Sequence, residues 1–180
     1  MDEALFEAAL AWDDYLASMT ANRQLLRGKL DAARLPAGGA AFWAGVGMPL
    51  RVLVFTEDWC QDSVTALPPL LAVARTAPRM EVRVLRRSQA LELARALTRN
   101  EYPPIPILLF YDETFRELGR FVEKPAGWDE LMNDPEQRAW LRGDPDMYDA
   151  LWAELELAQM RGIVVGAAAE RMWPVAGEPV

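Results

Sequence analysis

Apolar runs of strand length alternate with helix-length segments through the middle of this 180-residue chain, and this alternation restricts the fold more than any other feature. Strands are expected at residues 51–56, 80–85, 106–111 and 115–122, and helices at residues 60–77 and 88–100. Strands joined by helices form parallel βαβ units, whereas the short turn at 112–114 joins antiparallel strands. The sequence therefore predicts an α/β fold with a central four-stranded mixed sheet and helices on both faces.

Helical segments are expected before and after this region. Residues 3–34 have the pattern of one long amphipathic helix that ends at residues 36–39, where proline and glycine interrupt it. Arg23 falls on the apolar stripe of this helix, either with its stem packed and its head in water or as a cation directed toward the thiol or a bound anion. The stripe consists of Leu5, Ala9, Trp12, Leu16, Met19, Leu26 and Leu30. Phe42 and Trp43 then follow in a loop, where we expect them to plug the core.

The chain becomes helical again after residues 124–127. Asp144 is the expected N-cap of a C-terminal helix, with Pro145 at its first position. Gly162 and Gly166 argue against a single unbroken helix that reaches Trp173, because glycine disfavours the helix interior.

Charge and residue usage exclude several classes of function. The formal net charge of −8 disfavours nonspecific binding to nucleic acid or anionic lipid. The chain has no histidine, which removes Ser-His-Asp and Cys-His catalysis and zinc sites built from cysteine and histidine. Its acidic start differs from a secretory signal, and no apolar run reaches the roughly 18 to 20 residues that span a bilayer. One cysteine fits a reducing compartment, so we expect a cytoplasmic protein without a metal.

The single cysteine, Cys60, lies where the first strand of the βαβ pattern meets its helix, in the run Trp59-Cys60-Gln61-Asp62-Ser63. A thiol at the N-terminus of a helix lies near backbone N–H groups and the positive end of the helix dipole. Both stabilise a thiolate, the dipole by roughly 0.3 to 1 kcal/mol. Cys60 is therefore the residue that the sequence favours for nucleophilic chemistry.

Charged side chains near Cys60 have opposite effects on the stability of its thiolate. Glu57, Asp58 and Asp62 lie within three residues of it and repel a second negative charge. Arg86 and Arg87 follow the second strand, at the sheet edge where α/β folds bind ligands. They either compensate these carboxylates or are solvated surface side chains.

The order of elements and three motifs resemble the thioredoxin family over residues 50–124. Trp59-Cys60-Gln61-Asp62-Ser63 stands where that family has Trp-Cys-Gly-Pro-Cys. Pro68 matches the proline that kinks the family's active-site helix, and Ile105-Pro106 matches the Ile-Pro whose cis proline faces the active-site cysteine. The single-cysteine Cys-x-Asp-Ser site and the long leading helix are similar to a poorly characterised bacterial branch of thioredoxin-like proteins.

This resemblance implies a thioredoxin-like fold in one domain over residues 1–180. The domain divides into an N-terminal helical extension (1–48), the thioredoxin-like core (50–124) and a C-terminal helical region (125–180). The implied catalytic residues are Cys60, Ser63 and Pro106, and the implied substrate-binding or tuning residues are Trp59, Asp62, Ile105, Arg86 and Arg87. Two departures matter: Ser63 replaces the resolving cysteine, and Val54 stands where thioredoxins carry a buried acid.

Two classes of function remain open. The first is a monothiol thiol-disulfide oxidoreductase that acts on protein or small-molecule disulfides or thiols, needs no cofactor, and uses glutathione or another low-molecular-weight thiol as co-substrate. Thiol-transfer chemistry such as glutathione conjugation remains a lesser possibility beside the two classes. The second is a redox-inactive binding module that uses the same scaffold. In it, the added helices form an interaction surface or a homodimer interface with Trp12, Trp140, Trp152 and Trp173. Complete burial of Cys60 would argue against the first class.

Overall fold

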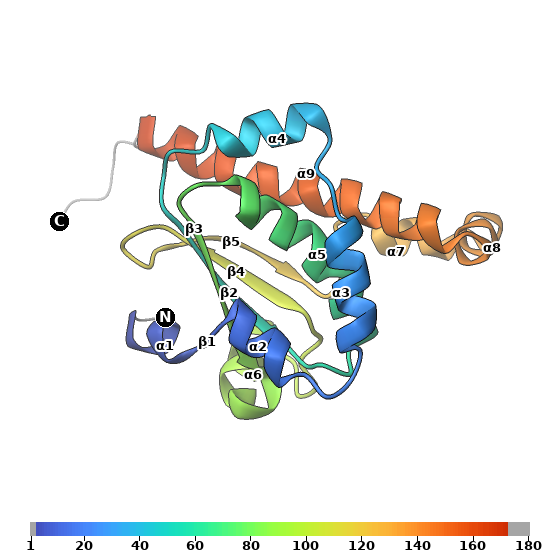
Figure 1. The fold of residues 1–180 in the computed structure, drawn as a ribbon, viewed down its shortest axis with the longest axis horizontal. Helices are drawn as coiled ribbons and strands as arrows, with labels where there is room; N and C mark the ends of the chain where they lie inside the picture. The colour runs from blue at the N-terminus through green and yellow to red at the C-terminus, as the bar shows by residue number, and fades with distance from the viewer. Residues whose placement is uncertain (1–2, 173–180) are drawn as a thin grey trace.

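One mixed five-stranded sheet forms the centre of the computed structural model, which describes residues 3–172 (Figure 1). Its spatial order is β1-β3-β2-β4-β5, and only β2 and β3 are parallel. The strands are β1 (Leu10–Ala11), β2 (Leu50–Thr56), β3 (Met80–Arg86), β4 (Ile107–Tyr111) and β5 (Glu117–Val122). The predicted mixed α/β sheet is confirmed. The prediction missed β1 because a two-residue strand is too short for an alternating pattern.

The central strand β2 separates two cores. Val52 and Val54 belong to a large core on one face of the sheet, whereas Leu53 and Phe55 belong to a smaller core on the other. All four side chains are fully buried, as expected for a continuous apolar run in a strand covered on both faces. This burial fixes the position of the turn that follows Thr56.

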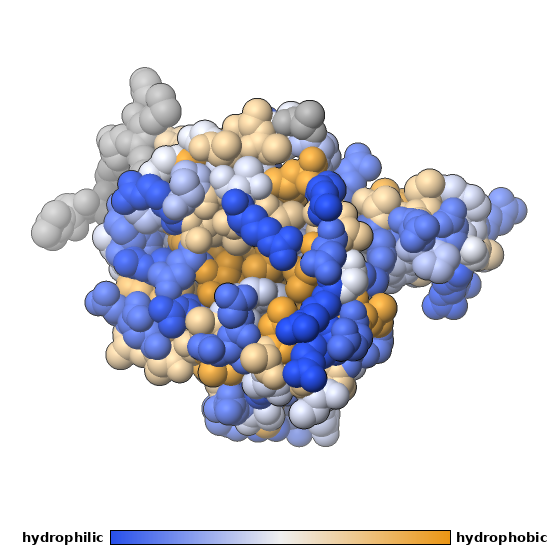
Figure 2. Space-filling model, in the orientation of Figure 1, coloured by the Kyte–Doolittle hydropathy of each residue, from blue (hydrophilic) through white to orange (hydrophobic). Residues whose placement is uncertain are grey.

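Helices of the large core pack around α5 (Gln61–Thr76), which lies between α3 (Arg23–Ala32) and α9 (Pro145–Met172) (Figure 1). The smaller core is closed by α1 (Glu3–Ala8) and α6 (Leu91–Thr98), which contribute Phe6 and Ala94. The remaining helices are α2 (Trp12–Ser18), α4 (Ala37–Ala44), the 3-10 helix η1 (Arg87–Gln89), α7 (Trp128–Asn133) and α8 (Pro135–Gly143). Figure 2 shows hydrophobic residues near the middle of one face, surrounded by hydrophilic residues. No helix within residues 3–172 is both long enough and apolar enough to cross a membrane.

The prediction of one helix over residues 3–34 is wrong, because three helices and a strand occupy this segment. Leu10 and Ala11 leave the helix to pair with Val84 and Arg83 of β3. A second break follows α2, where Asn22 adopts a left-handed φ of 55°. Strand pairing and the turn therefore override an apolar stripe that fits one helix. Arg23, after this break, has an exposed side chain whose Nη1 donates to the carbonyl of Ala17 at 3.1 Å.

Residues 37–44 form helix α4 rather than the predicted loop. Pro36 precedes the helix instead of only ending the previous one, and its carbonyl accepts the first helical bond from Ala40 at 2.8 Å. Trp43 is buried in the large core, as expected, while Phe42 is partly exposed. The guanidinium carbon of Arg161 in α9 lies over the Phe42 ring, 4.7 Å from its centroid.

The C-terminal helix begins as predicted and continues further than predicted. Asp144 caps α9, since its Oδ1 accepts a hydrogen bond from the Met147 amide at 3.0 Å. The helix passes Gly162 and Gly166 without a break and continues to Met172. Packing of α9 on α5 and β5 outweighs the low helix propensity of two glycines. Trp173 lies outside the described residues. Of the other tryptophans proposed for an interface, Trp152 is buried in the core, Trp12 is partly buried and Trp140 is exposed.

Candidate active site around Cys60

Cys60 occupies the N-cap position of α5, at the end of the turn that follows β2. Its side chain is largely buried, with 8% exposed. The Sγ atom donates a hydrogen bond to the carbonyl oxygen of Ile105 at 3.4 Å. The peptide bond that follows, Ile105-Pro106, is cis. The turn after β2 and the loop before β4 therefore meet at the sulfur. The carbonyl oxygen accepts this bond only while the thiol carries its proton.

The outer rim of the site contains Trp59 and Arg87. Trp59 is 55% exposed. The guanidinium carbon of Arg87 lies 5.2 Å from the centroid of the Trp59 ring, within the range of a cation–π contact. The Nη1 atom of Arg87 also donates to the carbonyl of Pro103 at 2.9 Å. Arg87 thus joins the two segments that meet at Cys60. Tyr102, beside Pro103 in the chain, is 78% exposed.

Hydroxyl groups lie among the buried residues at the base of this turn. Thr56 Oγ1 donates to Ser63 Oγ at 2.7 Å, and both side chains are buried. Ser63 is therefore bonded to Thr56 rather than exposed at the rim. Val54 lies in the apolar large core, as its side chain requires. Burial raises the pKa of Tyr15 to about 12, although Thr56 and Arg86 beside it act in the opposite direction. Tyr15 consequently keeps its proton at neutral pH.

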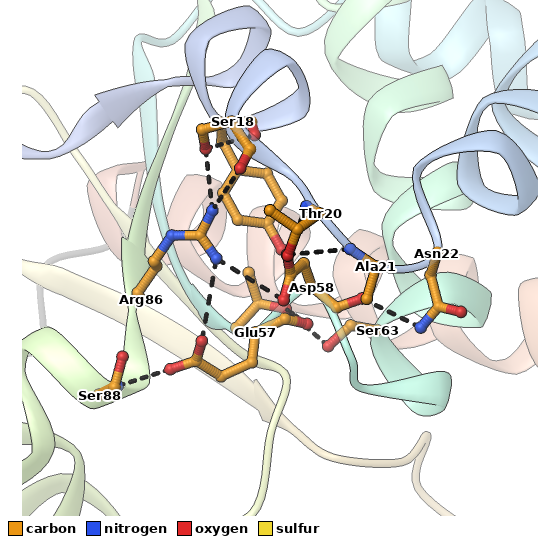
Figure 3. Close-up of polar contacts among 11 residues, drawn as sticks. Ser18, Thr20, Ala21, Asn22, Glu57, Asp58, Ser63, Arg86 and Ser88 are labelled. Carbon is orange, nitrogen blue, oxygen red and sulfur yellow. Dashed lines mark hydrogen bonds and ion pairs between the residues drawn. The ribbon is translucent and has the colours of Figure 1, made fainter.

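The carboxylate of Asp58 holds the segment between α2 and α3 against the Cys60 turn (Figure 3). Its Oδ2 accepts bonds from the Thr20 amide at 2.7 Å, the Thr20 hydroxyl at 2.9 Å and the Ala21 amide at 3.2 Å. The Asn22 side chain donates to the Asp58 carbonyl at 3.0 Å. The backbone bond from Thr20 is the largest cause of the lowered pKa of Asp58, and burial opposes it. Asp58 is therefore an ionised structural group.

Arg86 points into the same cluster, between the two carboxylates and the end of α2 (Figure 3). Its Nη1 lies 3.9 Å from Glu57 Oε2 and 3.9 Å from Asp58 Oδ1. Its Nη2 donates to the carbonyl and the hydroxyl of Ser18 at 3.2 and 2.9 Å. The other oxygen of Glu57 accepts from the Ser88 amide at 2.6 Å. Two of the three carboxylates near Cys60 are thus engaged with a cation and with backbone N–H groups.

Asp62, the third carboxylate, is partly buried in the first turn of α5. Burial raises its pKa, and the charge of Lys124 opposes this shift. Asp62 therefore differs from Asp58, whose hydrogen bonds favour the ionised form. No group of three or more cysteine, aspartate or glutamate side chains within residues 3–172 is placed to hold a metal ion.

Sequence reasoning missed the contribution of residues 18–22. A signal was present, because Ser18, Thr20 and Asn22 are polar residues whose side chains compete with helical hydrogen bonds. Their clustering at alternate positions indicates a turn. Without the fold, however, nothing pointed to Asp58 as their partner.

Comparisons with known proteins agree with this architecture. The family model described as thioredoxin matches residues 9–139. A crystal structure of a protein of unknown function from Pseudomonas aeruginosa is 26% identical, with a TM-score of 0.75, and the match covers 93% of this chain and 99% of that chain. An HIV epitope-scaffold is 25% identical, with a TM-score of 0.71 and coverage of 92% and 99%. A search of curated proteins finds no match. Since the family match spans well over half of its residues, the chain belongs to the thioredoxin family.

Proposed function

We propose that the protein is a monothiol thiol-disulfide oxidoreductase, in which Cys60 forms a mixed disulfide that an external thiol resolves. The observation that carries this proposal is the placement of the only cysteine at the N-terminus of α5, against the carbonyl that precedes Pro106. Serine occupies position 63, so no second thiol of this chain can attack the mixed disulfide. A cytoplasmic location fits this reaction, because an external thiol is available in a reducing compartment.

The proposed cycle has two exchange steps. In the first, the Cys60 thiolate attacks one sulfur of a disulfide R–S–S–R′. The Cys60–S–S–R bond forms, the original S–S bond breaks, and R′–S⁻ leaves. In the second, an external thiolate attacks the sulfur of R, forms its own disulfide with R, and releases the Cys60 thiolate. Two S–S bonds form and two break, so the substrate disulfide is reduced at R′ while the external thiol is oxidised. Thiol protons exchange with water.

Local residues have defined parts in this proposal. The first attack requires the Cys60 sulfur to lose its proton and its bond to Ile105, after which the N–H groups at the start of α5 and the helix dipole favour the anion. Arg86 offsets the charges of Glu57 and Asp58 in the same turn. We assign to Pro106 the wall of the site in the loop before β4, because the carbonyl of Ile105, directly before it, contacts the sulfur.

A redox-inactive binding module is the second candidate, and the burial of Cys60 favours it. Only 8% of the cysteine is exposed, and its sulfur contacts the Ile105 carbonyl oxygen at 3.4 Å. In this alternative, the exposed aromatic residues Trp59 and Tyr102 would contact a protein partner while the thiol stays unreactive.

Formation of the mixed disulfide separates the two candidates. Native protein is mixed with excess bis(hydroxyethyl) disulfide and followed by intact mass, and the same protein in denaturant reports the reactivity of an accessible thiol. The oxidoreductase forms one adduct, releases it when glutathione is added, and accelerates exchange between the disulfide and glutathione. The variant C60S should do none of these. If only the denatured protein forms the adduct, the thiol is architectural and the proposal is wrong.

A further inference from the structure

We infer that Arg87, held on the ring of Trp59, binds the carboxylate of a small thiol or disulfide that reacts at Cys60. This inference rests on the proposed function and names the chemical class of its co-substrate. The two consecutive arginines at the end of β3, Arg86 and Arg87, differ in the groups that surround their side chains.

The charge of Arg86 is already engaged by carboxylates of the protein. Its guanidinium faces the carboxylates of Glu57 and Asp58 and donates twice to Ser18. Its cation also lies over the ring of Tyr15, 5.2 Å from the centroid. These partners surround the side chain with groups of the protein itself (Figure 3). Arg86 is therefore a structural cation.

Arg87 is placed differently. Within residues 3–172, no carboxylate lies within ion-pair distance of its guanidinium, and its hydrogen bond is the one to the Pro103 carbonyl. A guanidinium carries five N–H donors, so most of them remain for a ligand. The side chain is partly exposed, and Trp59 covers one face of it. The ring restricts the orientation of the guanidinium but does not neutralise its positive charge.

Arg87 contacts both of the segments that meet at Cys60. Trp59 directly precedes Cys60, and Pro103 lies two residues before Ile105, whose carbonyl contacts Cys60 Sγ. Arg87 touches both segments. A ligand whose carboxylate pairs with Arg87 therefore has its sulfur brought to the rim of the Cys60 site.

The electrostatics favour a small ligand over an acidic protein. Glu57 and Asp58 face the site but are engaged with Arg86 and with backbone N–H groups, and burial raises the pKa of Asp62. Arg87, by contrast, carries a charge that no carboxylate of residues 3–172 pairs with. The whole chain carries a formal charge of −8, which repels an acidic macromolecule over a long range. A planar carboxylate on a small molecule fits the donor fork of an arginine.

A charge series of otherwise similar disulfides tests this inference. Dithiodipropionate carries two carboxylates, bis(hydroxyethyl) disulfide is neutral, and cystamine carries two ammonium groups. The rate of adduct formation at Cys60 is measured by intact mass for the wild type, R87Q and R87K. R27Q is the matched control, because Arg27 is an exposed arginine of α3 and its loss changes the net charge equally.

The expected result is a selective loss in R87Q. Its rate with dithiodipropionate should fall roughly 10-fold, the scale of one charge-assisted hydrogen bond, while its rate with the neutral disulfide stays within about 2-fold. R87K should recover part of the loss, and R27Q should match the wild type with all three reagents. An equal fall with all three reagents would mean that Arg87 only supports the site structurally, and unchanged rates would mean that it binds no carboxylate. Either result overturns the inference and leaves the proposed function standing. A wild type that reacts with none of the reagents overturns the proposed function itself.

Discussion

A buried glutamate in α9 offers a sharp test of how this fold tolerates a titratable group. Glu156 is fully buried, and its Oε2 accepts a hydrogen bond from Trp152 Nε1 at 3.0 Å. Its other carboxyl oxygen has no hydrogen-bond partner among residues 3–172. Burial raises the pKa of Glu156 well above the ordinary value of 4.5, although the Trp152 bond opposes the shift. The folded protein therefore holds this proton at a pH where the unfolded chain has lost it.

The sign and size of the effect follow from proton linkage. Because the folded state binds more protons than the unfolded state, the stability of the wild type falls as pH rises between the two pKa values. Between the unfolded and the folded pKa of Glu156, the fall approaches about 1.36 kcal/mol for each pH unit. In Glu156→Gln the side chain cannot titrate, and its amide oxygen can still accept the Trp152 bond. The variant should therefore gain stability relative to the wild type as the pH rises through this interval, by up to about 1.36 kcal/mol for each pH unit.

Urea denaturation at several pH values measures the difference directly. The wild type, E156Q and E154Q are unfolded side by side, with E154Q as the control because Glu154 is exposed on the same helix. The difference in unfolding free energy between E156Q and the wild type should widen with pH, whereas that of E154Q should stay nearly constant. A difference between E156Q and the wild type that does not change with pH would refute the reasoning.

Three further perturbations test the packing and the site. Asp58→Asn should destabilise the protein by about 1 to 3 kcal/mol in urea denaturation at neutral pH, because an amide replaces an ionised acceptor of three hydrogen bonds. The lowered pKa of Asp58 means that this difference is present above its unfolded pKa and shrinks as the pH falls through the folded value, so an undiminished difference in acid would count against it. Ser63→Cys should place a second thiol one helical turn from the first, so oxidation should remove both free thiols in a thiol assay; two thiols that persist would contradict this expectation. Gly119→Ala should cost about 1 to 3 kcal/mol in thermal unfolding, because the added Cβ would lie 2.9 Å from Ile163 Cγ1, whereas Gly166→Ala, with no atom within 4 Å of its Cβ, should be neutral or stabilising.

Local pattern was sufficient for the middle of the chain. The strand over residues 50–56, the helix after Cys60 and the hairpin over residues 107–122 all follow from periodicity and turn residues, whose effects act over a few neighbours. The same pattern placed Cys60 at a helix N-terminus. The Ile105-Pro106 motif indicated which loop would face it, and the structure puts that carbonyl 3.4 Å from the sulfur. The strands and the helix were predictable because each depends on a short stretch of sequence, whereas the loop that faces Cys60 was expected from the resemblance to the thioredoxin family.

Tertiary structure decided the features whose partners lie far apart along the chain. The apolar stripe of residues 3–34 fits one helix, and only the edge of β3 and the carboxylate of Asp58, 38 residues from Thr20, break it. Arg86 and Arg87 are consecutive residues of the same type, and the sequence alone does not distinguish them. In the fold, the side chain of Arg86 lies beside the carboxylate of Asp58, whereas that of Arg87 lies over the ring of Trp59. The charge of a side chain is a property of the sequence, but whether that charge is engaged or available depends on the groups that folding brings beside it.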